Sequence, residues 1–304
     1  MDRLEWLLDS DPAIRWQVMA DLAQTSSDET ARERSRVAYE GWGARLLSLQ
    51  TEDGQWGGGV YSPKWISTTY TLLLLESLGA PPDAEPVKTA IERVDDQVTM
   101  GGLYLPFFSY RGETCIAGMV LNLSSYFGKA GTRSAQTIAW VLDEQLEDGG
   151  WNCQTVNGSV RSSFNTTLSV LEGLDGYRRA VDAGPEVDAS LRRGHEYLLE
   201  RRLMRALSTG RVINSRWKLF SFPPRWHYDV LRALDHFRKA DVRDSRQQEA
   251  IELVEGKESR DGVWTLQNPH RGRVHFDMEE GAGKPSRWNT LRALRVLQWY
   301  GSRD

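Results

Sequence analysis

Acid–base side chains stand together at two short stretches of the chain. Glu113 lies two residues before Cys115, and His227 lies two residues before Asp229. A histidine beside a carboxylate is a common pair in general acid–base catalysis, because the histidine ring titrates near neutral pH. Glu113 is a second acid, and a cysteine acts through its thiolate. We therefore expect catalytic roles for Glu113, Cys115, His227 and Asp229, with helix capping, surface pairing and apolar burial of the thiols as the alternative.

A Lys or Arg stands near the start of six apolar segments of the chain. These cations are Arg15, Lys64, Arg111, Arg161, Arg225 and Arg287. A cation at a helix N-terminus is unfavourable by roughly 0.3–1 kcal/mol, so six such placements need a reason. If they converge on one space, their side chains and the free helix N–H groups would bind an anion there. If they point outward, they pair with loop carboxylates such as Glu52 and Asp53.

A tryptophan directly follows four of these cations, at Trp16, Trp65, Trp226 and Trp288. Aromatic faces stabilise a cation or stack on a sugar ring. In the alternative interpretation, the tryptophans only wedge neighbouring helices apart. The first interpretation predicts substrate contacts from Trp65, Arg225, Trp226, Arg287, Trp288 and Asn289.

The segment from His270 to Arg287 is long and has no helical periodicity. Its residues His275, Asp277 and Glu279 alternate along the chain, so that in an extended stretch they would face the same way. Loops of this length in compact domains are often lids or binding elements. We expect the segment to cover a site, with a solvated insertion as the alternative.

The apolar segments recur at a fixed spacing along the chain. The aligned residues Trp16, Trp65, Cys115 and Asn165 lie roughly 50 residues apart, and each repeat holds two helix-periodic segments. Helices that cannot bury their apolar faces alone must stack on their neighbours. Six such pairs predict an all-α fold, an (α/α)6 toroid around a central cavity, in one domain spanning residues 1–304. An open helical-repeat scaffold is the alternative.

Three Gly-rich turns between the paired segments share a pattern. They read Gln50-x-x-Asp53-Gly54-x-Trp56, Gln145-x-x-Asp148-Gly149-x-Trp151 and Asp261-Gly262-x-Trp264, and a degenerate version spans Met100 to Tyr104. These turns resemble the Gln-Trp repeats of squalene and hopene cyclases, and related turns occur in protein prenyltransferase β subunits. The resemblance implies an α/α toroid in which the Gln and Trp side chains of the turns brace the outer helices.

The chain departs from these enzymes at their catalytic motifs. It contains no Asp-x-Asp-Asp acid motif and no Asp-Asp-x-x-Asp run for magnesium. Glu113-Thr114-Cys115 resembles the Asp-x-Cys zinc pair of protein prenyltransferase β subunits, which implies zinc as a cofactor with Cys115 and His227 as ligands. The family's histidine comes from the next repeat, where this chain has Asn165. Cys153 would replace the missing ligand if its loop folds inward.

The bulk properties exclude some classes of function. The net charge of −4 gives no basic field for nucleic acid. The apolar runs, such as Leu72 to Leu75, are too short for a transmembrane segment. Two cysteines make no disulfide framework, so we expect a reducing cytoplasmic location.

Taken together, these patterns predict an enzyme resembling terpene cyclases and prenyltransferases. It would bind an anionic, partly apolar small molecule, such as an isoprenoid diphosphate, in the central cavity. One alternative is a carbohydrate-active toroid that acts as a hydrolase, lyase or isomerase on an acidic sugar. The other is a non-catalytic helical-repeat binding scaffold. The oligomeric state is left open.

Overall fold

The regular structure of the chain is almost entirely helical, as the sequence predicts. The computed structural model describes residues 2–23, 25–100, 104–131 and 133–301. Its α-helices are α1 (Arg3–Leu8), α2 (Pro12–Asp21), α3 (Ser27–Arg36), α4 (Gly41–Leu47), α5 (Thr68–Leu78), α6 (Glu85–Gln97), α7 (Thr114–Tyr126), α8 (Ala135–Asp143), α9 (Phe164–Ala180), α10 (Pro185–Glu200), α11 (Val230–Lys239), α12 (Gln248–Glu255) and α13 (Arg287–Gly301). Two short strands, β1 (Thr99–Met100) and β2 (Leu105–Pro106), pair antiparallel. None of the described helices combines the length and apolar character that a membrane span requires.

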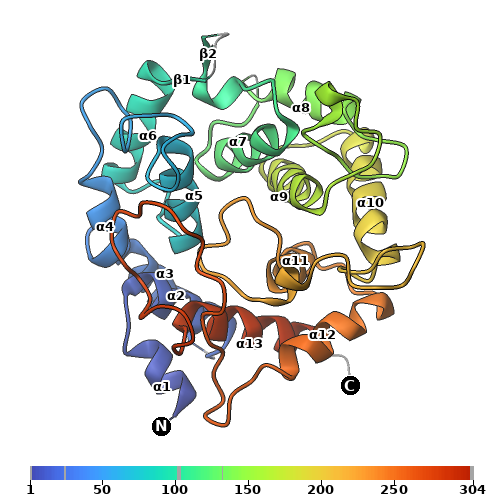
Figure 1. Cartoon of the computed structure of the whole chain (residues 1–304). Helices are drawn as coiled ribbons and strands as arrows, with labels where there is room; N and C mark the ends of the chain where they lie inside the picture. Colours follow the sequence, from blue (N-terminus) through green and yellow to red (C-terminus); the bar gives the residue numbers. More distant parts are fainter. Residues whose placement is uncertain (1, 24, 101–103, 132, 302–304) are drawn as a thin grey trace.

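Six helices, α2, α5, α7, α9, α11 and α13, contact one another in chain order, and we call them the inner helices (Figure 1). The indole of Trp16 in α2 donates to the carbonyl oxygen of Leu78 at the end of α5, over 2.9 Å. Helix α5 packs on α7, and α7 packs on α9. Arg232 of α11 pairs with Glu172 of α9, with Nε 2.9 Å from Oε1. Helix α13 packs on both α11 and α2, so the contacts return to the first inner helix.

Two glycines allow α7 and α9 to approach closely. A Cβ atom on Gly118 would lie 2.5 Å from the carbonyl oxygen of Ser169, and one on Gly173 would lie 2.4 Å from that of Gly118. No other residue fits at such distances without moving backbone. The two helices are therefore held backbone to backbone at the middle of the inner set.

The tryptophans of the Gly-rich turns fix the turns to the preceding helices. The indole nitrogens of Trp56, Trp151 and Trp264 donate to the carbonyl oxygens of Leu46, Val141 and Val254, each over 2.7 Å. All three rings are at most 1% exposed. A buried indole N–H needs such a partner, so each ring is held in one place.

The glutamines of the turns reach forward to the next outer helix. The Gln50 amide donates to the carbonyl oxygen of Ala90 in α6 over 2.9 Å, and the Gln145 amide donates to that of Ser190 in α10 over 3.0 Å. Each amide also donates to a carbonyl oxygen within its own turn. The bracing role that the resemblance implies for these glutamines and tryptophans is confirmed.

Two segments with little apolar periodicity still form regular helix. The polar stretch 25–33 includes most of helix α3, whose first turn is capped by Ser26. Helix α9 continues through Gly176, which lies beside Asn122 of α7, to Ala180. The degenerate turn expected at Met100 to Tyr104 includes residues 101–103, which lie outside the described part of the chain.

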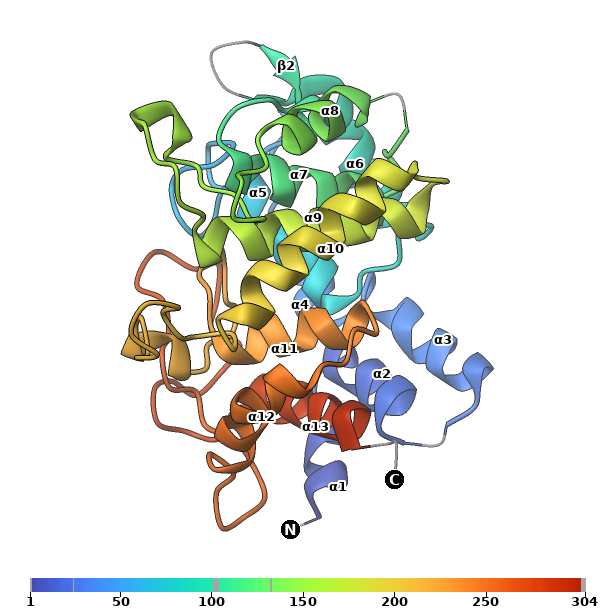
Figure 2. The ribbon, with the colours of Figure 1, turned by 90° about the vertical axis from the view of Figure 1, so that its right-hand side faces the viewer.

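The long loops gather at one side of the molecule. Figure 2 shows the loops before α9, α11 and α13 together at the left, where these helices begin. The loop before α13 packs on the start of α5. There the backbone N–H of Trp65 donates to the carbonyl oxygen of Arg273 over 2.8 Å, and its indole donates to that of Arg271 over 2.9 Å. The segment from His270 to Arg287 thus covers the start of α5, and whether it acts as a lid stays a prediction.

Candidate functional site

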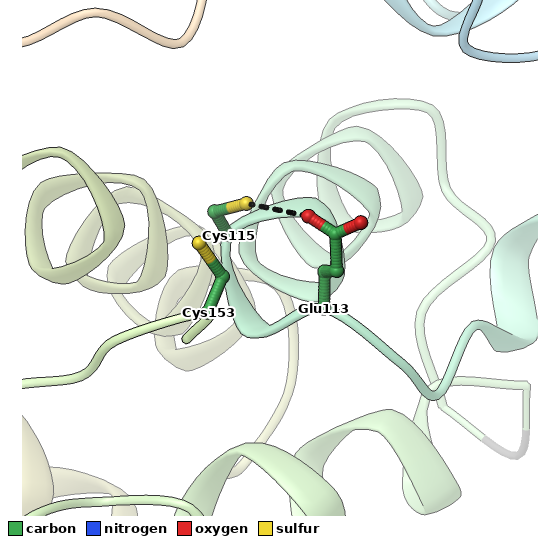
Figure 3. Close-up of side chains that lie close together, drawn as sticks. All are labelled: Glu113, Cys115 and Cys153. Atoms are coloured by element: carbon green, nitrogen blue, oxygen red, sulfur yellow. Dashed lines mark hydrogen bonds between the residues drawn. The ribbon is translucent and has the colours of Figure 1, made fainter. Parts of the chain in front are cut away.

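Two thiols and a carboxylate converge at the start of α7. Glu113, Cys115 and Cys153 turn toward one another, and one ligand atom from each lies within 4.8 Å of the other two (Figure 3). The Sγ atom of Cys115 is 3.9 Å from Oε2 of Glu113. Neither cysteine is in a disulfide. We call these three residues the thiol cluster.

The thiol cluster is built from two repeats of the chain. Glu113 is the N-cap residue of α7, and Cys115 follows in the first turn of that helix. Cys153 lies two residues after Trp151, whose ring is fixed by its bond to Val141. The backbone N–H of Cys153 donates to the hydroxyl of Thr166 in α9 over 3.4 Å. The hydrogen bond of the Trp151 indole, which fixes the Gly-rich turn to α8, thus also helps to place Cys153 beside Cys115.

The two thiols differ in acidity because one donates to the other. The hydrogen bond from Cys115 lowers the pKa of Cys153 to about 6 and raises the pKa of Cys115, which burial raises further. At neutral pH the pair therefore holds one thiolate, on the half-buried Cys153. A thiolate of this kind is a nucleophile or a metal ligand.

His227 lies in an aromatic stack outside the thiol cluster. Its ring centre is 4.0 Å from that of Trp226 and 3.9 Å from that of His270. Burial lowers the pKa of His227 to about 4 and that of His270 to about 3, so both rings are neutral at pH 7. The potential metal ligands beside Cys115 are Glu113 and Cys153, and His227 is not among them. The structure therefore does not place together Cys115 and His227, the ligand pair that the resemblance implies.

Asp229 holds the start of α11. One of its carboxylate oxygens accepts the backbone N–H of Arg232 over 2.8 Å, and the other accepts the hydroxyl of Ser221 over 2.9 Å. The side chain is buried. Both oxygens are therefore used in joining the helix to the preceding loop, which is the capping alternative and not acid–base catalysis.

The six predicted cations do not converge on one space. Arg15 points to α3, where its Nε is 2.6 Å from Oε1 of Glu33. Arg287 donates to the carbonyl oxygen of Trp6 over 3.1 Å, and its guanidinium lies 4.9 Å from the centre of that ring. Lys64, Arg111 and Arg161 are exposed. These six cations therefore do not form the anion-binding site expected at the helix starts. Of the six, only Arg225 lines the cavity among the inner helices, which is described below.

The expected aromatic contacts divide into two groups. Trp16 and Trp288 line the cavity, and Trp288 also stacks on Phe222 with ring centres 4.2 Å apart. Trp65 and Trp226 lie in the layer with His227, beneath the loop before α13. The guanidinium of Arg225 lies 5.6 Å from the centre of the Trp65 ring.

Asn289 and Glu279 have structural roles in the described contacts. The buried amide of Asn289 donates to the carbonyl oxygen of Thr265 over 3.1 Å. Glu279 accepts the hydroxyl of Ser286 over 2.6 Å and the backbone N–H of Trp288 over 3.3 Å. The loop before α13 is therefore tied to the start of that helix by a carboxylate. His275 is tied to α5, with Nε2 2.8 Å from the hydroxyl of Thr71, whereas Asp277 is exposed.

A cavity of about 340 Å³ lies among the inner helices. Helices α2, α5, α7 and α9 line it, from Tyr70 in the first turn of α5 to Tyr126 at the end of α7. Its wall also includes the loop residue Arg225 and, at the start of α13, Trp288. The cavity therefore reaches some of the helix starts, where the sequence predicts the working site.

Glu76 is the acid on the cavity wall that sequence reasoning missed. Burial raises the pKa of this carboxyl, and no Lys or Arg nitrogen among the described residues lies within 4.0 Å of it. Its signal in the sequence is a single charged residue inside the apolar run that forms α5. Buried charges are rare without a partner, so this position could have been singled out.

Neither a comparison with models of known protein families nor one with curated proteins returns a match for this chain.

Proposed function

We propose that the chain is an (α/α)6 toroid and an enzyme that holds an anionic, partly apolar small molecule in the cavity among its inner helices. The cavity itself carries this proposal. Its volume of about 340 Å³ is at the lower end of the range in which small-molecule sites of roughly 300–1,000 Å³ fall. The return of the helix contacts to α2 supports the closed arrangement over an open scaffold.

The lining of the cavity favours an anion with an apolar part. It includes eight Lys and Arg side chains and five Asp and Glu side chains. Several of the acids are neutralised by ion pairs, such as Asp235 with Arg295 and Glu172 with Arg232. Arg225 has no carboxylate within 4.0 Å among the described residues, and burial lowers its pKa to about 10. A half-buried guanidinium without a carboxylate partner is stabilised by an incoming anion.

Aromatic rings supply the apolar part of the same wall. Trp16, Tyr70, Tyr126 and Trp288 all line the cavity. Such rings accommodate an isoprenoid chain and stabilise a cationic intermediate through their π faces. A short-chain isoprenoid diphosphate therefore fits this site better than a uronic sugar, whose hydroxyls would need many more polar partners.

Glu76 is the group placed for proton transfer in this cavity. A carboxyl whose pKa is raised by burial keeps its proton nearer to neutral pH and can donate it to a bound molecule. The sequence lacks the acid motif of the cyclases, and Glu76 would supply that function from a different helix. Asp229 does not compete for this role because both its oxygens are engaged.

Ligand-induced stabilisation tests the proposal. A ligand present at one hundred times its Kd stabilises the folded state by about 2.7 kcal/mol. For a chain of this size, that raises the Tm by roughly 5 °C. Geranyl diphosphate should give this shift, whereas geraniol, inorganic diphosphate and galacturonate each lack one half of the recognised chemistry and should give little.

Two matched variants assign the effect to the cavity. Arg225→Gln removes the cation on the cavity wall and should abolish most of the shift. Arg161→Gln removes an exposed cation of the same predicted class and should leave the shift unchanged. A shift from galacturonate alone would favour the carbohydrate-active alternative, and no shift from any anion would favour the non-catalytic scaffold.

A further inference from the structure

We infer that Glu113, Cys115 and Cys153 form a binding site for a zinc-like divalent metal, with Cys153 as the third ligand and His227 outside the coordination sphere. Their ligand atoms already lie within 4.8 Å of one another. Tetrahedral zinc takes thiolates at about 2.3 Å and carboxylate oxygens at about 2.0–2.2 Å, so three such ligands stand within 4 Å or so of each other when bound. Only small side-chain rotations separate the described positions from that geometry.

The carboxylate of Glu113 is not used to cap its helix. Glu113 is the N-cap residue of α7, and its side chain makes no hydrogen bond to the first turn. It turns instead toward the sulfur of Cys115 (Figure 3). Its own backbone N–H is held by the hydroxyl of Tyr110 over 3.1 Å, which fixes the residue in this position.

Cys115 and Cys153 come from different repeats and meet through rigid neighbours. Cys115 is 7% exposed in the first turn of α7, and Cys153 is held by Thr166 of α9 and by the fixed ring of Trp151. Helices α7 and α9 are also the pair that the two close glycine contacts hold together. The cluster is therefore preformed by the scaffold, which lowers the cost of organising ligands around a metal.

The donor set selects the class of metal. Two thiolates and one carboxylate suit a borderline-soft ion such as zinc and do not suit magnesium or calcium, which take oxygen ligands. Both sulfurs bind as thiolates, so any proton that they carry leaves to the solvent. A divalent ion with these three anionic ligands leaves a net charge of −1.

Three protein ligands leave the fourth tetrahedral position for water or for a substrate atom, which is the arrangement of catalytic zinc sites. The ammonium of Lys64 lies 5.3 Å from the centre of the Tyr61 ring, and burial, with further contributions from the charges of Cys115 and Glu113, raises the pKa of Tyr61 to about 12. The Tyr61 phenol is therefore close enough to the cluster to respond to its charges, and the Lys64 ammonium lies over the ring of Tyr61. This site does not depend on the ligand proposed for the cavity, and either inference can fail without the other.

Cobalt(II) titration of the full chain tests the site. The protein is reduced, freed of metal with a chelator and titrated anaerobically, because Co2+ reports thiolate ligation by charge-transfer absorption and tetrahedral geometry by its visible bands. We expect saturation at one equivalent of Co2+, with absorption from two thiolates, and displacement of the cobalt by one equivalent of Zn2+.

Variants identify the ligands. Cys153→Ser should remove about half of the charge-transfer absorption and weaken binding by more than about 100-fold, beyond the 10–100-fold typical of outer-sphere partners. Glu113→Gln should keep the thiolate absorption and weaken binding. His227→Ala should change neither. Cys115 is buried and Cys153 is half-buried, so Cys153→Ser provides the test if Cys115→Ser fails to fold.

Three results would overturn the inference. The first is the absence of thiolate-to-cobalt absorption in the wild type. The second is full absorption retained by Cys153→Ser. The third is loss of binding in His227→Ala with the fold intact by circular dichroism, which would return the site to the ligand pair that the resemblance implies.

Discussion

Replacement of Gly79 by alanine probes how rigidly the cavity wall is built. Gly79 ends α5 with a φ of +80°, and a Cβ atom there would lie 2.2 Å from Cζ2 of Trp16. Gly128, just after α7, offers a matched control. It has a φ of +70°, but a Cβ atom there would meet no atom within 4 Å. The two substitutions share the backbone strain and differ in the contact with Trp16.

The expected magnitudes follow from these two differences. A left-handed conformation costs an alanine about 1–2 kcal/mol, so Gly128→Ala should destabilise the protein by that amount. Overpacking adds roughly 1–3 kcal/mol at Gly79. Trp16 cannot easily move away, because its indole donates to Leu78 and the guanidinium of Arg34 lies 5.2 Å from its ring centre. Gly79→Ala should therefore cost about 1–3 kcal/mol more than Gly128→Ala.

Urea denaturation at constant pH measures this difference. The shift in midpoint at a common m-value gives the change in free energy of unfolding for each variant. Tryptophan fluorescence and circular dichroism follow the same transition. Equal destabilisation of the two variants, within about 0.5 kcal/mol, would show that Trp16 yields freely and would refute the rigid wall.

Two further predictions concern the loop before α13 and the braces. Burial raises the pKa of Glu279 from the usual 4.5 to about 7, so the folded protein binds this proton more tightly than the unfolded chain does, and stability should fall as the pH rises through that interval. Glu279→Gln should remove up to about 3 kcal/mol of this fall, measured by urea denaturation at pH 5 and pH 8, and an unchanged pH dependence would contradict it. Gln145→Met leaves the carbonyl groups of Gly149 and Ser190 without their amide donor and should cost about 1–3 kcal/mol. The exposed Gln97→Met is its control, and an equal loss in both variants would exclude bracing by Gln145.

Most helices and the turns could be predicted from the sequence because their causes are local. An apolar period of 3.6, Pro12 after the capping Asp11, and glycine with positive φ at Gly54 and Gly149 all act within a few residues. The pairing of Glu113 with Cys115 is equally local, since two residues separate them. Even the approach of Cys153 could be proposed, because it occupies a fixed place after the Trp151 turn.

The working geometry depends on contacts between distant parts of the chain. Arg287 turns toward Trp6, and Arg15 turns toward Glu33 on a separate helix, so neither direction is encoded near the residue itself. His227 likewise lies outside the thiol cluster, with its ring stacked on that of His270, which is distant in the sequence.

The sequence by itself determined which segments are helical, how the turns brace them and that Glu113 stands beside Cys115. Tertiary structure alone decided that Cys153 and not His227 joins these two residues, where the cations point, that Asp229 is a cap, and that Glu76 is an acid on the cavity wall. The physical reason is that periodicity and turn chemistry act over a few residues. Burial, pKa and side-chain direction are instead set by whatever residue packs opposite, at any distance along the chain.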